Sequence, residues 1–321
     1  MVKEIIFIIL GFVLLIKGAD FLVDGASNIA KRFHIPEIVI GLTIVSIGTS
    51  MPELFVSTTS ALQGSADMSI GNIIGSNICN LLLILGLSAV ISPVKFQKAT
   101  CKIEIPMCFG ITVVFMLLAN IGQALDLMDA IILLVLFAGF IAYTFYVAKK
   151  GLAEAAESAE TAEETEEAPK KGAMLKNILW VVLGIVGLKI GGDWTVDNAV
   201  VIAEKVGLSE KVIGLTILAI GTSLPELVTS VMAAIKGNDD IAIGNIIGSN
   251  IFNMLMIIGV TAFITPLSYN VSYNIQLYIL LFALILLEIF AFTKPKNQMN
   301  RFNGIIYVAL YAMYMVLLFV I

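Results

Sequence analysis

Long apolar stretches alternate with short polar connections along nearly the whole chain. A helix needs about 20 consecutive apolar residues to cross a bilayer, and ten stretches approach or exceed that length. They lie at roughly 4–24, 37–62, 68–92, 103–122, 126–148, 175–200, 210–235, 241–266, 274–292 and 303–321. The pattern predicts an all-α integral membrane protein with ten transmembrane helices.

The second five stretches repeat the first five. With a shift of 173 residues, the two halves align without a gap over residues 11–86 and 184–259. The segment GLTIVSIGTSMPEL at 41–54 returns as GLTILAIGTSLPEL, and GNIIGSNICN at 71–80 returns as GNIIGSNIFN. An odd number of spans in each half places the halves in opposite orientations, which is the inverted-repeat plan of many secondary transporters.

The repeat divides the chain into three parts. The first five-helix repeat covers residues 1–148, with its motifs at 41–86, and the second covers 174–321, with its motifs at 214–259. Between them, 149–173 carries seven glutamates interspersed with alanine. A regulatory Ca²⁺ sensor is one interpretation, but the segment lacks the D-x-D-x-D-G order of an EF-hand loop. We therefore interpret it as a solvated, partly helical linker.

Basic residues are distributed unequally between the two sets of loops. Loops on the N-terminal side of the membrane hold 3 Lys or Arg residues, and loops on the opposite side hold 14. Cytoplasmic loops carry the excess of positive charge, so we expect both termini outside the cell membrane and the acidic linker in the cytoplasm. Some charged residues within spans lie near span ends, where snorkelling or ion pairing accounts for them: Lys17, Asp20, Lys189 and Asp193.

Composition agrees with a membrane location and excludes other classes of protein. Hydrophobic residues make up 59% of the chain and charged residues 13%, against about 25% charged in soluble proteins. No basic cluster is interleaved with aromatic residues, so we expect no nucleic-acid partner, and no required protein partner is evident. Cys79, Cys101 and Cys108 lack metal-ligand spacing, and we expect them to be apolar packing residues.

Each half carries the motif G-T-S-x-P-E in the middle of a span. A carboxylate at the bilayer centre costs about 2.5–3.5 kcal/mol or more, so Glu53 and Glu226 indicate function. Two facing anions repel unless a cation lies between them or a proton neutralises one. Pro52 and Pro225 have no N–H, so we expect each helix to kink and leave carbonyls unpaired one turn earlier. Each motif therefore supplies a carboxylate and free backbone oxygens.

Other oxygen-bearing side chains accompany these carboxylates. Helical spacing places a threonine on the face of each glutamate, and the G-N-x-x-G-S-N segments form a polar stripe with a period of four. These residues are Thr49, Ser50, Asn72, Ser76 and Asn80, with Thr222, Ser223, Asn245, Ser249 and Asn253. An all-oxygen set suits a hard cation, and its flexible geometry suits Ca²⁺ better than Mg²⁺. One Ca²⁺ would balance the two glutamates.

The paired G-T-S-x-P-E and G-N-x-I-G-S-N-I segments resemble the alpha repeats of the cation/calcium exchanger superfamily. They are most similar to its sodium/calcium exchanger branch, including compact archaeal members, and the resemblance covers nearly the whole chain. It implies that Glu53 and Glu226 bind Ca²⁺ together with the backbone of Thr49 and Thr222. It also implies that Na⁺ uses the same carboxylates and a further set of oxygens from Ser50, Ser223, Ser76, Ser249, Ser46 and Ala219.

One position distinguishes branches of this superfamily. Asn253 occupies the position in the second repeat that Asn80 occupies in the first, and both are candidate metal ligands. In the potassium-dependent branch an Asp at the position of Asn253 is linked to K⁺ transport. The resemblance therefore argues against K⁺ dependence, and it also separates this chain from archaeal members that carry Asp there.

We expect a secondary active antiporter that exchanges Na⁺ for Ca²⁺ by alternating access, with no enzymatic activity and no cofactor. Spans 1 and 6, which are rich in glycine, would slide across a core of spans 2, 3, 7 and 8. An H⁺/Ca²⁺ antiporter using Glu53 and Glu226 as proton carriers is the main alternative, and a cation channel is another. An intramembrane protease is disfavoured, because the only histidine, His34, lies near a span end.

Overall fold

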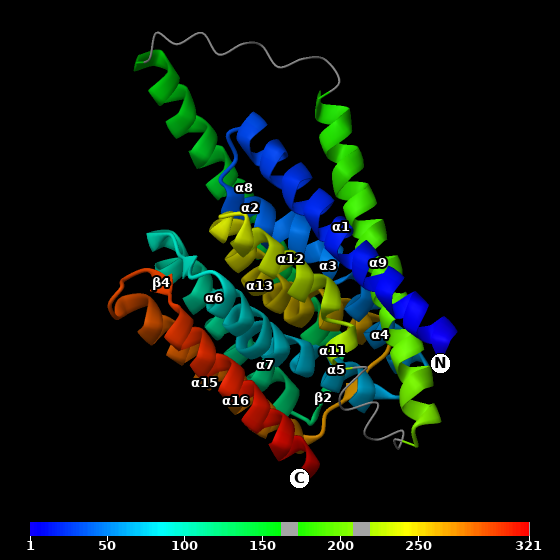
Figure 1. Cartoon of the computed structure of the whole chain (residues 1–321). Coiled ribbons are helices and arrows are strands. Elements are labelled where there is room, and N and C mark those ends of the chain that lie inside the picture. The colour runs from blue at the N-terminus through cyan, green and yellow to red at the C-terminus, as the bar shows by residue number, and fades with distance from the viewer. Residues whose placement is uncertain (162–172, 208–218, 321) are drawn as a thin grey trace.

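Over the residues that the structure describes, the protein is nearly all helical, with short strands in connections between helices (Figure 1). The structure is a computed structural model. It describes residues 1–161, 173–207 and 219–320, with the backbone alone at the edges of these ranges, over 154–161, 173, 219 and 319–320. The predicted fold class, a helical integral membrane protein, is confirmed.

The first half, residues 1–161, begins with a long helix and continues through several shorter ones. Its elements are α1 (Val2–Arg32), α2 (Glu37–Ile40), η1 (Gly41–Val45), α3 (Ser46–Thr49), α4 (Met51–Leu62), α5 (Ala66–Ile78), η2 (Cys79–Leu85), α6 (Gly86–Ile91), β1 (Val94–Lys95), η3 (Thr100–Glu104), α7 (Ile105–Asn120), β2 (Ala124–Leu125) and α8 (Leu127–Thr161). Segments η1 and η2 are π-helical turns that join helices without ending the span, and η3 is a π-helical turn that leads into α7.

The second half, residues 173–320, repeats this order. Its elements are α9 (Ala173–Lys205), α11 (Ala219–Gly221), α12 (Leu224–Ile235), α13 (Asp239–Phe252), η5 (Asn253–Ile257), α14 (Ile258–Ile264), β3 (Leu267–Ser268), η6 (Val271–Tyr273), α15 (Asn274–Phe292), β4 (Gln298–Met299) and α16 (Arg301–Val320). Segment η5 is π-helical and η6 is a single 3₁₀ turn.

The described residues contain eight helices that are long and apolar enough to cross a membrane. A ninth span is formed by residues 37–49 and 51–62 together, which meet at a bend of 48°. The tenth expected span, 210–235, lies partly outside the described residues, as do residues 162–172 of the acidic linker. The linker begins as helix, because α8 continues to Thr161.

Helices α1 and α9 lie side by side on one flank of the molecule (Figure 1). A Cβ atom on Gly11 would lie 2.8 Å from the carbonyl oxygen of Gly191, and one on Gly25 would lie 2.9 Å from that of Asn177. The contacts run in opposite directions along the two helices, so the pair is antiparallel. The absence of side chains at these glycines allows the two backbones to touch over several turns.

Two central spans form the core, and the other helices surround them. In the most apolar windows of spans 66–91 and 239–264, 78% and 83% of the residues are buried. The corresponding shares in the other spanning helices lie between 22% and 39%, because one side of each faces lipid. Helices α5 and α13 therefore hold the most protected positions in the protein.

Two short antiparallel ribbons tie the halves together outside these spans. Strand β1 pairs with β4, with Val94 opposite Met299, and strand β2 pairs with β3, with Leu125 opposite Leu267. In each ribbon, one strand comes from the first half and the other from the second. The halves therefore share backbone hydrogen bonds as well as side-chain contacts.

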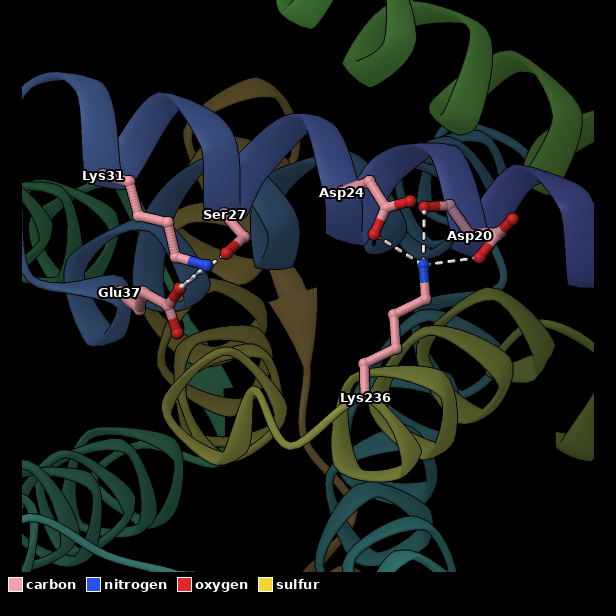
Figure 2. A network of polar contacts seen from close by, with 6 residues as sticks. All are labelled: Asp20, Asp24, Ser27, Lys31, Glu37 and Lys236. Atoms are coloured by element: carbon pink, nitrogen blue, oxygen red, sulfur yellow. Dashed lines mark hydrogen bonds and ion pairs between the residues drawn. The ribbon is translucent and has the colours of Figure 1, made fainter. Parts of the chain in front are cut away.

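The turn after α12 is tied to α1 by a charged side chain (Figure 2). Lys236 forms ion pairs with Asp20 and with Asp24, the latter at 2.6 Å. All three side chains are only partly exposed, at 23%, 31% and 39%. This contact joins the α1/α9 pair to the end of a core helix, and it shows that Asp20 is paired, as one of the sequence interpretations proposed.

A second polar contact lies further along α1 (Figure 2). Ser27 donates a hydrogen bond of 2.6 Å to Glu37 at the start of α2, and Lys31 lies 4.0 Å from the same carboxylate. On α9, Lys189 pairs with Asp193 at 2.6 Å, one helical turn away. That pair is about half exposed, so it contributes little to stability.

Candidate cation site

The helix is interrupted at the same point of both G-T-S-x-P-E motifs. Helix α3 ends at Thr49, Ser50 adopts φ −85° and ψ 8°, and α4 begins at Met51. In the second half, α11 ends at Gly221 and α12 begins at Leu224. The kink expected from proline is a complete break, because a proline in the first turn of a new helix needs no N–H partner.

The break changes the electrostatic setting of the two glutamates. Glu53 lies in the first turn of α4 and Glu226 in the first turn of α12, so both carboxylates are at helix N-termini. The N-terminus of a helix carries a partial positive charge that favours an anion. The preceding short helix ends nearby with carbonyl groups that its own turns cannot satisfy. Each break therefore brings a stabilised carboxylate and free carbonyl oxygens to one place.

Serine hydroxyl groups donate to both carboxylates, and two of the hydrogen bonds of these serines cross between the halves. Ser50 donates a hydrogen bond of 2.9 Å to Oε1 of Glu226, and Ser76 donates one of 3.4 Å to Oε1 of Glu53. Ser223 in turn donates to the hydroxyl of Ser76 at 3.3 Å. The motif of one half thus completes the surroundings of the carboxylate in the other.

The first asparagine of each G-N-x-x-G-S-N segment is used to hold neighbouring helices. Asn72 donates to Ser57 at 3.0 Å, and Asn245 donates to Ser230 at 2.9 Å, which is the equivalent contact. The oxygen of Asn245 also accepts a hydrogen bond of 3.1 Å from Thr49. These residues fix α5 and α13 against the broken spans.

The later asparagines meet between α5 and α13. Asn80 donates to Oδ1 of Asn250 at 3.0 Å, and Asn253 donates to Oδ1 of Asn77 at 2.9 Å. Asn77 and Asn250 were not among the predicted site residues, because a stripe with a period of four passes them by. Their identical place in both halves, after the Gly-Ser pair, was the signal that could have found them.

Several oxygens of this region are buried and have no hydrogen-bond partner among the described residues. They are Oε2 of Glu53, Oε2 of Glu226, Oδ1 of Asn80, Oδ1 of Asn253, Oγ of Ser249 and Oγ1 of Thr222. A buried polar atom without a partner costs about 1–3 kcal/mol, and more for a charged group. A cation bound among them would remove that cost, so the residues fit a cation site.

The structure places the predicted site residues as follows. At most 2% of the residue surface is exposed for Glu53, Glu226, Ser46, Thr49, Ser50, Ser76, Ser223, Ser249, Asn80 and Asn253. Thr222 is partly buried, and Ala219 begins α11, although its side chain lies outside the described residues. The hydrogen bonds described above join five of these twelve residues, Ser50 to Glu226 and Ser223 through Ser76 to Glu53. The role of all twelve as ligands stays a prediction.

The chemistry of this site is that of neutral oxygens around two carboxylates. Over the residues that the structure describes, no three side chains of His, Cys, Asp or Glu gather as a metal cluster. Transition metals favour nitrogen and sulfur ligands, whereas Na⁺ and Ca²⁺ accept carbonyl, amide and hydroxyl oxygens. Broken helices that meet at buried oxygens inside a helical bundle define the class of protein: a cation transporter of the inverted-repeat type.

Comparison with known proteins places the chain within this class. The profile of the family described as sodium/calcium exchanger protein matches residues 3–146 and 176–320. The chain is 33% identical to the sodium/calcium exchanger MaX1 of Methanosarcina acetivorans over 97% of each chain. It is 37% identical to the inner membrane protein YrbG of Escherichia coli over 87% of each.

A solved structure agrees with the sequence comparisons. The sodium-calcium exchanger NCX_Mj, soaked with 2.5 mM Na⁺ and 0.1 mM Ca²⁺, superposes with a TM-score of 0.83 at 32% identity, over 98% of both chains. This chain therefore belongs to the sodium/calcium exchanger protein family, as its repeated motifs suggested. It is a multi-pass membrane protein of a family of transporters.

Proposed function

We propose that this protein is a secondary antiporter that exchanges Na⁺ for Ca²⁺ across the cell membrane by alternating access. The observation that carries the proposal is the set of buried oxygens without partners around Glu53 and Glu226. Two carboxylates balance one Ca²⁺, and Na⁺ competes for the same oxygens. Because the two cations exclude each other, the gradient of one drives transport of the other. The names of MaX1 and NCX_Mj favour Na⁺ over H⁺ as the coupling ion.

The proposed ligands are those that the sequence indicated. Ca²⁺ would be held by the carboxylates of Glu53 and Glu226 and by the backbone of Thr49 and Thr222. The oxygens proposed for Na⁺ and for completing the site belong to Ser50, Ser223, Ser76, Ser249, Asn80, Asn253, Ser46 and Ala219. Ca²⁺ and Na⁺ are substrates here, and the proposal includes no cofactor and no protein partner.

A crevice of about 270 Å³ leads toward the site between α9 and the two broken spans. Asp193 and Asp197 of α9 line it, together with Thr222 and Pro225 of the second motif. We propose that this side faces the outside of the cell, with both termini, and that the linker 149–173 between the repeats 1–148 and 174–321 is cytoplasmic. The positive charge of the opposite loops supports that orientation.

On the opposite side, Lys236 ties α1 to the end of α12, and we propose that this contact closes the path from the cytoplasm. We expect Lys236→Met to shift the protein from the outward-open toward the inward-open state by about fivefold, because about 1 kcal/mol of ion pairing is lost. The native cysteines are buried, so Val56→Cys in the crevice can be labelled selectively by an impermeant thiol reagent added outside. Its labelling rate should fall when Lys236 is replaced.

The matched control for this prediction is Lys205→Met. Lys205 pairs with Glu4 at 2.6 Å, but that contact lies within the α1/α9 pair and does not reach the core. Its loss should leave the labelling rate of Val56→Cys unchanged. Equal labelling in all three proteins would show that the Lys236 contact does not control access.

The coupling ion is tested with purified protein in liposomes. An outward Na⁺ gradient should drive uptake of ⁴⁵Ca²⁺ at least about tenfold above the rate without a gradient, and an outward proton gradient should not. Uptake driven only by protons would leave the assignment of the cation site unchanged, and it would identify the activity as H⁺/Ca²⁺ exchange. Uptake that ignores both gradients would reject antiport, and single-channel currents would then identify a cation channel.

A further inference from the structure

Four asparagines form a closed set of hydrogen bonds where α5 crosses α13. Asn77 donates its amide to the backbone carbonyl of Asn250 at 3.1 Å, and Asn250 donates to that of Asn77 at 3.3 Å. Asn253 and Asn80 then donate to the side-chain oxygens of Asn77 and Asn250. All four residues are at most 1% exposed.

The order of these bonds determines which way each amide faces. A backbone carbonyl can only accept, so Asn77 must turn its NH₂ group toward Asn250 and its oxygen away. That oxygen needs a donor, and Asn253 supplies its NH₂ group. The oxygen of Asn253 must then point in the other direction, where it is buried without a partner. The same holds for the other pair. Asn250 turns its NH₂ group toward the carbonyl of Asn77, its oxygen accepts from Asn80, and the oxygen of Asn80 is left buried without a partner.

We propose that Asn77 and Asn250 are positioning residues, which hold the amides of Asn253 and Asn80 so that oxygen and not nitrogen faces the cation. The inference rests on the proposed function, because it concerns the same cation site. A free amide can rotate by half a turn, and its NH₂ group would then repel a cation. Fixed amides therefore supply two neutral oxygen ligands beside the carboxylates. Because these amides are already oriented, no conformational entropy is lost in turning them when an ion binds.

The hydrogen bonds define two matched pairs, each across the halves. Asn77 orients Asn253, and Asn250 orients Asn80. The crossed pairs, Asn77 with Asn80 and Asn250 with Asn253, share no side-chain to side-chain bond. If Asn77 served only general packing, its replacement would weaken transport equally in variants that lack the Asn253 amide and in variants that lack the Asn80 amide. A positioning role of Asn77 acts only through Asn253. Double-mutant cycles separate the two roles.

The experiment measures the KM for Ca²⁺ in Na⁺-driven uptake. We expect Asn77→Ala to raise KM about tenfold, with a smaller effect on the maximal rate. On an Asn253→Ala background, the same substitution should add less than about twofold, because the amide that it orients is gone. On an Asn80→Ala background, it should again cost about tenfold. Asn250→Ala should show the mirror pattern, with Asn80 as the matched partner.

Asn77→Leu is run beside Asn77→Ala, because leucine has the same branched arrangement of heavy atoms as asparagine and removes both polar atoms. Thermal unfolding without Ca²⁺ reports whether each variant is folded. An unchanged KM, equal effects on both backgrounds, or failure of both variants to fold would overturn the positioning role. A wild-type protein without gradient-driven uptake would instead reject the proposed function, so the two failures are distinguishable.

Discussion

Replacing Glu53 or Glu226 with glutamine should reduce Na⁺-driven Ca²⁺ uptake by at least about 100-fold. Glutamine keeps the size and the hydrogen bond that Oε1 accepts from a serine, but it removes one of the two charges that balance Ca²⁺. Removing one partner of a buried charge pair costs about 3–5 kcal/mol, and each 1.4 kcal/mol is tenfold in affinity. Initial rates of ⁴⁵Ca²⁺ uptake into liposomes measure the loss.

Glu104→Gln is the matched control for these substitutions. Glu104 is also 1% exposed and also accepts a hydrogen bond, from Tyr143 of α8, but it is the last residue of η3, which continues into α7, and it does not lie at a helix break. Its replacement should leave uptake within about twofold of the wild type. If Glu104→Gln were as damaging as Glu53→Gln, loss of any buried carboxyl would explain the result and the site assignment would fail.

Gly184→Leu should lower the thermal unfolding temperature by several degrees and abolish transport. A Cβ atom at Gly184 would lie 2.7 Å from the backbone nitrogen of Leu22 and 2.8 Å from the carbonyl oxygen of Gly18. Backbone atoms cannot move aside as a side chain does, so α1 and α9 must separate, and overpacking of this kind costs about 1–3 kcal/mol or more. If the pair moves as one body, its separation also removes the proposed gate.

The two tryptophans of the chain report directly on this contact. Trp194 packs against Phe7 at 5.2 Å and Trp180 against Phe21 at 5.5 Å, so each joins α9 to α1. Intrinsic fluorescence should therefore change in Gly184→Leu even below the unfolding transition. Gly110→Leu is the control, because nothing in the structure lies within 4 Å of its missing Cβ. A Gly184→Leu protein that unfolds at the same temperature as the wild type would contradict the prediction.

Features that repeat locally were predictable from the sequence. The shift of 173 residues identified both broken spans from the sequence alone. Mid-span glutamates are recognisable because charge in an apolar stretch is costly wherever the helices pack.

Features that depend on how distant segments meet were not predictable. Lys236 follows its partner Asp24 by 212 positions, and no local pattern links them. Asn77 lies off the polar stripe of its own helix, and its importance appears only when α13 supplies Asn253 and a backbone carbonyl. Proline indicated a kink, but the new helix that starts at Met51 depends on packing around the break.

The paired ribbons also determine the order in which the protein can mature at the ribosome. Strand β1 is synthesised about 200 residues before its partner β4, and β2 is likewise synthesised before its partner β3. Until then, Glu53 and Asn77 of a nascent first half have no counterparts from the second half, in a lipid that cannot hydrogen-bond to them. The contacts between the halves therefore form only as the second half is inserted, so a chain that stops at the linker would be a substrate for membrane quality control.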